Sequence, residues 1–224
     1  HIAKARLPHT RGVCDPYSVP FADARGCEAL LRNRSAWTHI EPMAPRFEQR
    51  TIKFRVTVPN GAGAAALGLP ATVQGILKVP QVLFPTEPFS EVAAYAIERA
   101  LGLHRVPPTA LVAVPIDELL AVARQQGANV PMVSEFNDAG LTWPQWVTKD
   151  VVEWLRSTKH EHFTTGAGGA LVWCSVQLVI DGVAPLLQTP LALPYSKAKP
   201  GWHRWFNPRW AGFAKLREKG PRVQ

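Results

Sequence analysis

Alternating apolar and polar positions predict the strands of this chain. The clearest alternation runs over 52–58, where four apolar side chains share one face: Ile52, Phe54, Val56 and Val58. Lys53, Arg55 and Thr57 face the other way, so we expect a strand with one buried side. Further apolar, β-branched runs predict three more strands, over 72–79, 109–114 and 170–180. A Gly/Ala-rich turn at 60–70 would join the first two into a hairpin.

Apolar residues at helical spacing predict the helices. Four segments have this period: 22–33, 91–101, 116–126 and 143–156. In the second, Ser90 is placed to cap the start and Gly102 follows the end, as is common at helix termini. The order of elements predicts an α+β fold, a small antiparallel sheet with one packed helix and a helical insertion over 116–158 between two strands.

Composition narrows the class of protein. The chain has 224 residues, 46% hydrophobic and 19% charged, which is too apolar for a disordered protein. It has no run of about 20 apolar residues of the kind that spans a membrane, so we expect no transmembrane span. Prolines break up residues 1–50 and the region after 183. We therefore expect an extended N-terminal arm (1–50), a central domain (51–182) and a C-terminal arm (183–224).

The cysteines give little sign of metal chemistry. The chain has three of them, Cys14, Cys27 and Cys174, with no CxxC pair. His160 and His162 have no thiol at zinc-finger spacing, so no metal site is expected. Two states remain open: three free thiols in a reducing compartment, or a Cys14–Cys27 bridge in an oxidising one.

Positive charge is concentrated at the C-terminal end. The formal net charge is +8, and residues 196–224 alone carry eight basic and one acidic side chain, a net charge of +7. Large aromatic residues alternate with these cations, which favours a binding surface for RNA, an anionic lipid surface or an acidic groove on another protein. The residues expected to bind a partner are Trp202, Arg204, Trp205, Phe206, Arg209, Trp210 and Phe213.

Two adjoining runs resemble a known family: SEVAAY at 90–95 and ERALGLHRVPPT at 98–109. They are similar to the four-jointed type of secretory-pathway kinases and to bacterial phosphatidylinositol-kinase-like proteins. GILKVP at 75–80 and CSVQLVI at 174–180 resemble the lysine strand and the later strand of the same small lobe. The resemblance implies a kinase-like small lobe in which Lys78 contacts the nucleotide and Glu91 holds that lysine.

The chemistry expected of a complete kinase is not found in the sequence. Only Asp181 and Glu218 are acidic after residue 180, so no catalytic residue and no metal-binding Asp can be assigned. The small residues at 60–68 occupy the position of a phosphate-covering loop, but a simple flexible turn is the favoured interpretation. The chain thus resembles a small lobe without its large lobe.

These observations favour a non-catalytic, pseudokinase-like scaffold. We expect an accessory subunit bound to other protein subunits of a large complex, without a cofactor. The basic composition and a first residue, His1, that is not Met favour a mitochondrial energy-converting complex or mitochondrial ribosome. The alternative function is one piece of an ATP-dependent protein or lipid kinase whose large lobe lies elsewhere. The alternative location is the lumen of the secretory pathway. Lys78 and Glu91 would then form the nucleotide site.

Overall fold

The structure, a computed structural model, describes residues 12–17, 21, 24–45, 51–132, 140–158, 163–166 and 169–180. The strands are β1 (His39–Pro42), β2 (Lys53–Pro59), β3 (Thr72–Lys78), β4 (Thr109–Pro115), β5 (Phe163–Gly166) and β6 (Gly169–Leu178). The α-helices are α1 (Arg25–Arg32), α2 (Glu87–Ala100), α3 (Ile116–Gln126), α4 (Trp143–Val147) and α5 (Trp154–Thr158), with a π-helix, η5 (Thr148–Glu153), between the last two. The predicted α+β class is therefore confirmed.

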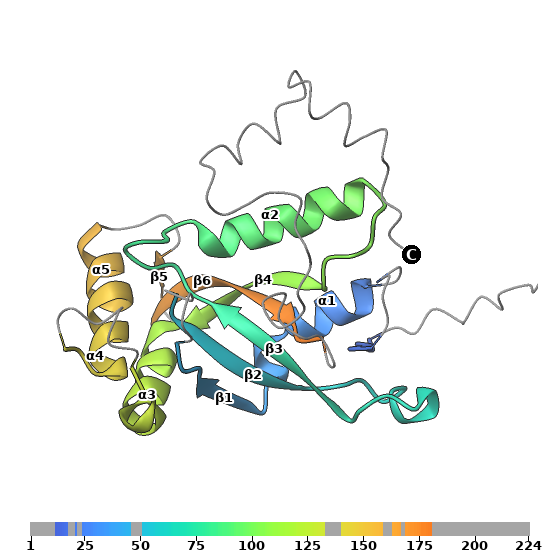
Figure 1. Ribbon diagram of the computed structural model, residues 1–224, viewed down its shortest axis with the longest axis horizontal. Helices are drawn as coiled ribbons and strands as arrows, with labels where there is room; N and C mark the ends of the chain where they lie inside the picture. Colours follow the sequence, from blue (N-terminus) through green and yellow to red (C-terminus); the bar gives the residue numbers. More distant parts are fainter. Residues whose placement is uncertain are drawn as a thin grey trace, which may run out of the picture. The chain divides into compact units, whose positions relative to one another are not determined.

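All pairings in the sheet are antiparallel, and the strand order is β1-β2-β3-β6-β4, with β5 paired to β6 (Figure 1). The β2–β3 hairpin predicted from the sequence is present, with Lys53 opposite Lys78 at its open end. β6 comes last along the chain but lies between β3 and β4. The strand that comes last in the described chain therefore joins β4 to β1, β2 and β3.

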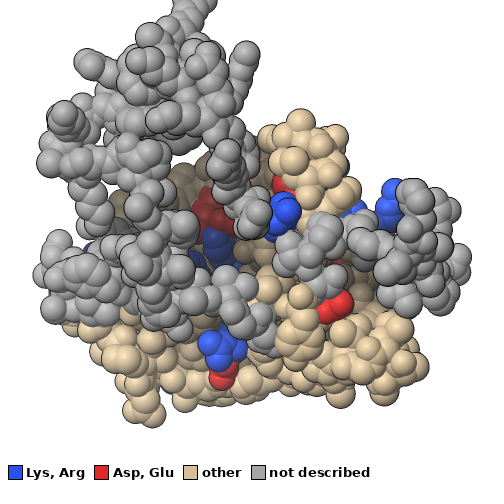
Figure 2. Space-filling model, turned by 45° about the vertical axis from the view of Figure 1, so that its right-hand side comes forward, with Lys and Arg blue, Asp and Glu red and all other residues tan. Residues whose placement is uncertain are grey.

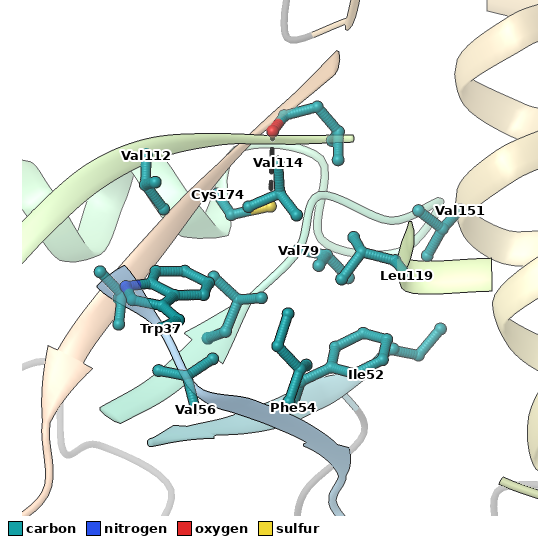
Figure 3. Packing of buried hydrophobic residues seen from close by; sticks show 14 of the residues in the cluster. Trp37, Ile52, Phe54, Val56, Val79, Val112, Val114, Leu119, Val151 and Cys174 are labelled. Carbon is teal, nitrogen blue, oxygen red and sulfur yellow. Dashed lines mark hydrogen bonds between the residues drawn. The ribbon is translucent and has the colours of Figure 1, made fainter. Parts of the chain in front are cut away.

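One face of the sheet forms the dry core. The residues that face it alternate along each strand, and Phe54, Val56, Leu77, Val112, Cys174 and Val176 are all at most 3% exposed. Helices α1, α3 and α4 pack on this side, and Figure 3 shows Leu119 and Trp37 among the strand side chains. The ring of Trp143 meets Phe54 edge to face, with ring centroids 5.2 Å apart. Burial of this apolar surface is the main stabilising term of the fold.

Gly75 of β3 leaves room for side chains of the two neighbouring strands, β2 and β6, to pack over it. An ideal Cβ at Gly75 would lie 2.8 Å from a methyl group of Val176 and 2.9 Å from one of Val56. Any side chain would therefore push those two valines apart. The glycine lets β-branched residues of β2 and β6 fill the space above β3.

Helix α2 covers the opposite face of the sheet, as Figure 1 shows. It begins at Glu87 with Pro88 in its first turn, one turn earlier than expected, so Ser90 is inside the helix and does not cap it. The Ser90 hydroxyl instead donates a hydrogen bond to the Thr86 carbonyl oxygen, 3.1 Å away. Gly102 follows the helix with φ of 68°, the left-handed conformation that glycine permits, as predicted.

The N-terminal region does not match the expected extended arm. Within residues 1–50, α1 and β1 belong to the domain, and Leu31, Trp37 and Ile40 lie in its core. The helix predicted over 22–33 is present as α1, but β1 was not expected, because four residues carry too little pattern and prolines flank them. The C-terminal arm expected over 183–224 lies outside the described residues.

A disulfide joins Cys14 to Cys27, and Cys174 is a buried free thiol. Of the two cysteine states considered from the sequence, the structure has the bridged one. The bridge ties residues 12–17 to α1, and Asn60 holds the same segment from the other side. Its side chain accepts a hydrogen bond from the Cys14 N–H at 2.7 Å and donates one to the Cys14 carbonyl oxygen at 2.8 Å.

Among the described residues, no helix combines the length and the apolar character needed to cross a membrane.

Candidate functional site

The face of the sheet beneath α2 carries charge in its middle. Cross-strand pairing places four residues in one row from β4 to β2: Leu111, Ser175, Lys78 and Lys53. A row of this kind runs across the sheet at a spacing of about 4.8 Å per strand. Two lysines therefore lie side by side under a helix, where burial of charge is costly unless it is compensated.

Compensation comes from the first turns of α2. Glu87 and Glu91 are four residues apart, so they project from the same face of the helix. Lys78 Nζ is 3.3 Å from Glu87 Oε1 and forms an ion pair and hydrogen bond with Glu91 Oε1. The Lys78 side chain is only 15% exposed, so this is a partly buried ion pair. The predicted Lys78–Glu91 pair is present.

Glu87 is the site residue that sequence reasoning missed. Its side chain is 17% exposed, and its Oε2 atom is buried without a hydrogen-bond partner among the described residues. The helix was expected to begin at Glu91, which placed Glu87 in a preceding loop. The useful signal was the proline that follows it, because proline is favoured in the first turn of a helix.

Lys53 completes a group of two cations and two carboxylates. Burial lowers the pKa of its ammonium, the positive charge of Lys78 lowers it further, and Glu87 and Glu91 oppose the shift. The four groups, Lys53, Lys78, Glu87 and Glu91, are called the charge cluster below. It has two positive and two negative formal charges, and Glu87 and Glu91 of the helix hold Lys78 in place.

The other half of α2 is fixed by polar contacts to the segments around it. The Tyr95 hydroxyl donates to Glu28 Oε1 of α1 at 2.5 Å, and burial together with this bond raises the pKa of the phenol. Glu98 accepts a hydrogen bond from the Arg105 N–H, and Arg99 donates to the Phe21 carbonyl oxygen. These bonds fix the orientation of α2, and with it the charge cluster.

Among the described residues, the metal and thiol chemistry considered from the sequence adds nothing to this site. No group of three or more His, Cys, Asp or Glu side chains within the described ranges could hold a metal ion. Cys174 and Ser175 are buried, and burial raises the pKa of the Cys174 thiol. His160, His162 and the seven tail residues expected to bind a partner lie outside the described residues.

On the face drawn in Figure 2, the visible Lys and Arg atoms of the described residues lie in separate small groups.

No family model matches this chain, and neither does any of the curated proteins or solved structures compared with it.

Proposed function

We propose that the described domain is the nucleotide-binding small lobe of an ATP-dependent phosphotransferase. The observation that carries the proposal is the lysine of β3, Lys78, held under α2 by Glu91. In kinases a strand lysine binds the α- and β-phosphates and a helix glutamate keeps it in place. The sequence alone favoured a non-catalytic scaffold over a nucleotide-binding lobe. The position of the ion pair now favours the nucleotide-binding lobe.

The sheet supports the same proposal. Lys78 is the last residue of β3 and its neighbours are Lys53 on β2 and Ser175 on β6. An ammonium at the end of a strand can reach a phosphate outside the sheet while its stem stays packed beneath the helix. Transfer of a phosphoryl group also needs acidic residues that bind Mg²⁺ and orient the acceptor, which a second lobe would contribute.

The disulfide supports an oxidising compartment for this lobe. Bridges such as Cys14–Cys27 persist in secreted and luminal proteins and are rare where glutathione keeps thiols reduced. This favours the lumen of the secretory pathway over the mitochondrial location first expected.

A reactive ATP analogue tests the nucleotide site. An acyl phosphate ester of ATP transfers its acyl group to a lysine amine beside the bound phosphates: the amine attacks the carbonyl carbon and ATP leaves. With the full chain, we expect acylation at Lys78 or the adjacent Lys53 that excess ATP suppresses. Peptide mass spectrometry locates and quantifies the label.

Lys149 is the matched control, because it is an exposed lysine on η5, away from the sheet. Its acylation should not respond to ATP. Equal labelling of Lys78 and Lys149, with no protection by ATP, would contradict nucleotide binding. So would protection that persists after Lys78→Ala combined with Lys53→Ala.

A second function, the non-catalytic accessory subunit, is favoured by a different observation. Three large apolar side chains at the end of α2 face solvent: Ile97, Leu101 and Leu103 are 61%, 67% and 56% exposed. Apolar residues grouped in this way often mark a protein contact. Such a subunit would use α2 as its binding surface, with the charge cluster serving only to hold the helix on the sheet.

Assembly in the native source separates the two functions. Ile97→Asp with Leu101→Asp should release the chain from a large complex, as seen by native electrophoresis. Ala121→Asp with Gln125→Asp changes two exposed positions of α3 at the same spacing and should have no effect. A chain that migrates alone in all three forms would rule out the accessory role.

A further inference from the structure

A pocket of about 570 Å³ lies beside the second half of α2, and the functions proposed above do not use it. Residues from one face of each of three elements, α1, α2 and β4, line it. Arg25, Glu28 and Arg32 come from α1, spaced three and four residues apart, and Thr109 and Leu111 come from alternate positions of β4. Most of the pocket is therefore built by regular structure, and His104 adds one residue from the connection between α2 and β4.

The α2 wall of the pocket is also one helical face. Its residues recur at intervals of three and four: Val92, Tyr95, Ala96, Arg99 and Ala100. With Leu111 they provide an apolar floor and one side wall. A ligand that fits this wall needs a compact apolar body as well as a polar group.

The charged groups that line the pocket differ in whether other side chains or the backbone hold them. Arg99 is fixed by its bond to the Phe21 carbonyl oxygen and lies over the Tyr95 ring, 5.9 Å from its centroid. Glu28 is fixed by the Tyr95 hydroxyl. Arg25 and Arg32 are exposed and form no ion pair with the described residues. Arg25 and Arg32 are therefore the two guanidinium groups of the pocket with no carboxylate partner among the described residues.

His104 adds a second, independent sign of a ligand. It is the one non-glycine residue with positive φ, 54°, within the described part of the chain. Its Nδ1 atom is buried and has no hydrogen-bond partner there. Strained backbone and an unsatisfied buried polar atom both have a cost, and both are concentrated where proteins bind ligands. His104 lines this pocket.

We infer that this pocket binds a small phosphate monoester with a compact apolar body. Such an ester carries about −1.5 to −2 charges at pH 7, so its phosphate oxygens can bind both Arg25 and Arg32. Guanidinium groups bind phosphate oxygens through paired hydrogen bonds, which favours phosphate over a carboxylate of single charge. His104 Nδ1 would supply or receive one further bond.

The pocket is separate from the charge cluster. Leu111 pairs with Ser175, which pairs with Lys78, so two strand spacings, about 10 Å, lie between the pocket floor and that lysine. The inference does not rest on the proposed nucleotide site, and either one can fail alone.

Calorimetric titration of the full chain with phenyl phosphate tests the inference. Arg25→Ala with Arg32→Ala should weaken binding by about tenfold or more, because two charged hydrogen-bond donors are lost. Both arginines are exposed, so the variant should fold normally. Arg124→Ala with Arg156→Ala removes the same charge from the helical insertion and should change affinity by less than twofold.

Two further measurements probe the chemistry. Benzenesulfonate has the same ring with a single charge, so we expect it to bind at least about fivefold more weakly than phenyl phosphate. His104→Gly should weaken phenyl phosphate binding while leaving the melting temperature equal or higher, because glycine relieves the positive φ. Equal affinities for the two anions, or an unchanged affinity in the Arg25/Arg32 variant, would overturn the inference.

Discussion

The two faces of the sheet differ in polarity: one is apolar and the other carries paired charges. The face toward α1 and α3 is dry: Leu77 and Phe54 are fully buried and meet only apolar neighbours such as Val176. The face toward α2 holds two lysines and two carboxylates that must be paired to be stable. The same strand, β3, contributes alternate residues to both.

This difference separates residues that maintain the fold from residues that are available for chemistry. An apolar face gains stability from every buried methylene group and needs no particular partner. A buried ion pair gains little over an apolar replacement, so its stabilising contribution is a weak explanation for its presence. The proposed binding role would account for the charge cluster where a contribution to folding does not, and the following variants test how much each face contributes to stability.

Adjacent residues of β3 give the most direct contrast. Leu77 faces the core with no exposed surface, whereas Ile76 faces α2 and is partly exposed. We expect Leu77→Ala to lower the free energy of unfolding by about 3–4 kcal/mol, since it leaves a cavity, and Ile76→Ala by about 1 kcal/mol. Urea denaturation measures both. Equal losses would show that the two faces are packed alike.

The disulfide extends the dry face toward the N-terminus. Cys14 and Cys27 are both in the core cluster and close a loop with a sequence separation of 13 residues. Cys14→Ser with Cys27→Ser should cost about 3 kcal/mol, chiefly by giving the unfolded chain more freedom. The wild type under reducing conditions should show the same loss. If the variant has the same melting temperature as the oxidised wild type, the bridge contributes nothing to stability.

The charge cluster should respond less to a single change. In Glu91→Gln, Lys78 keeps Glu87 at 3.3 Å, so we expect a loss of about 1–2 kcal/mol instead of the larger loss of an unpaired buried charge. Glu41 pairs with Arg55 at 3.2 Å on the surface, and Glu41→Gln should cost under about 0.5 kcal/mol. A loss of 3 kcal/mol or more for Glu91→Gln would show that Glu87 does not compensate.

Tyr95 should give the smallest effect, confined to high pH. Because its pKa is raised, the phenol stays protonated in the folded state when the unfolded state begins to ionise near pH 10. Its contribution is complete below that pH and is lost as pH rises further. Absorbance at 295 nm should show a late-titrating phenol component. Tyr95→Phe should remove that component; if it does not, the hydroxyl is not protected.

Local patterns were enough to predict most of the elements. Period-2 alternation located β2, and helical spacing gave 116–126, the observed range of α3. β1 was missed because four residues carry too little pattern, and β5 because its pairing with β6 is a tertiary contact. The π-helix η5 was also missed, since it interrupts a segment whose apolar spacing is helical throughout.

The site was less predictable than the fold. Lys78 and Glu91 came from a resemblance together with the rule that a buried lysine needs a carboxylate. Glu87 and Lys53 depend on where a helix begins and on strand register, which one sequence defines poorly. The pocket joins α1, α2 and β4, segments separated by many residues, so no local spacing indicates it.

The central place of β6 sets a condition on how the chain folds during synthesis. β4 is joined to β1, β2 and β3 only through β6, so the two parts of the sheet cannot come together until residues 169–178 have been made and released from the ribosome. Up to that moment the nascent chain carries a hairpin and an isolated strand with open edges, which are prone to mispairing and to chaperone binding. Expression of this domain therefore requires a boundary beyond residue 178, and a stalled or shortened product should accumulate as aggregate.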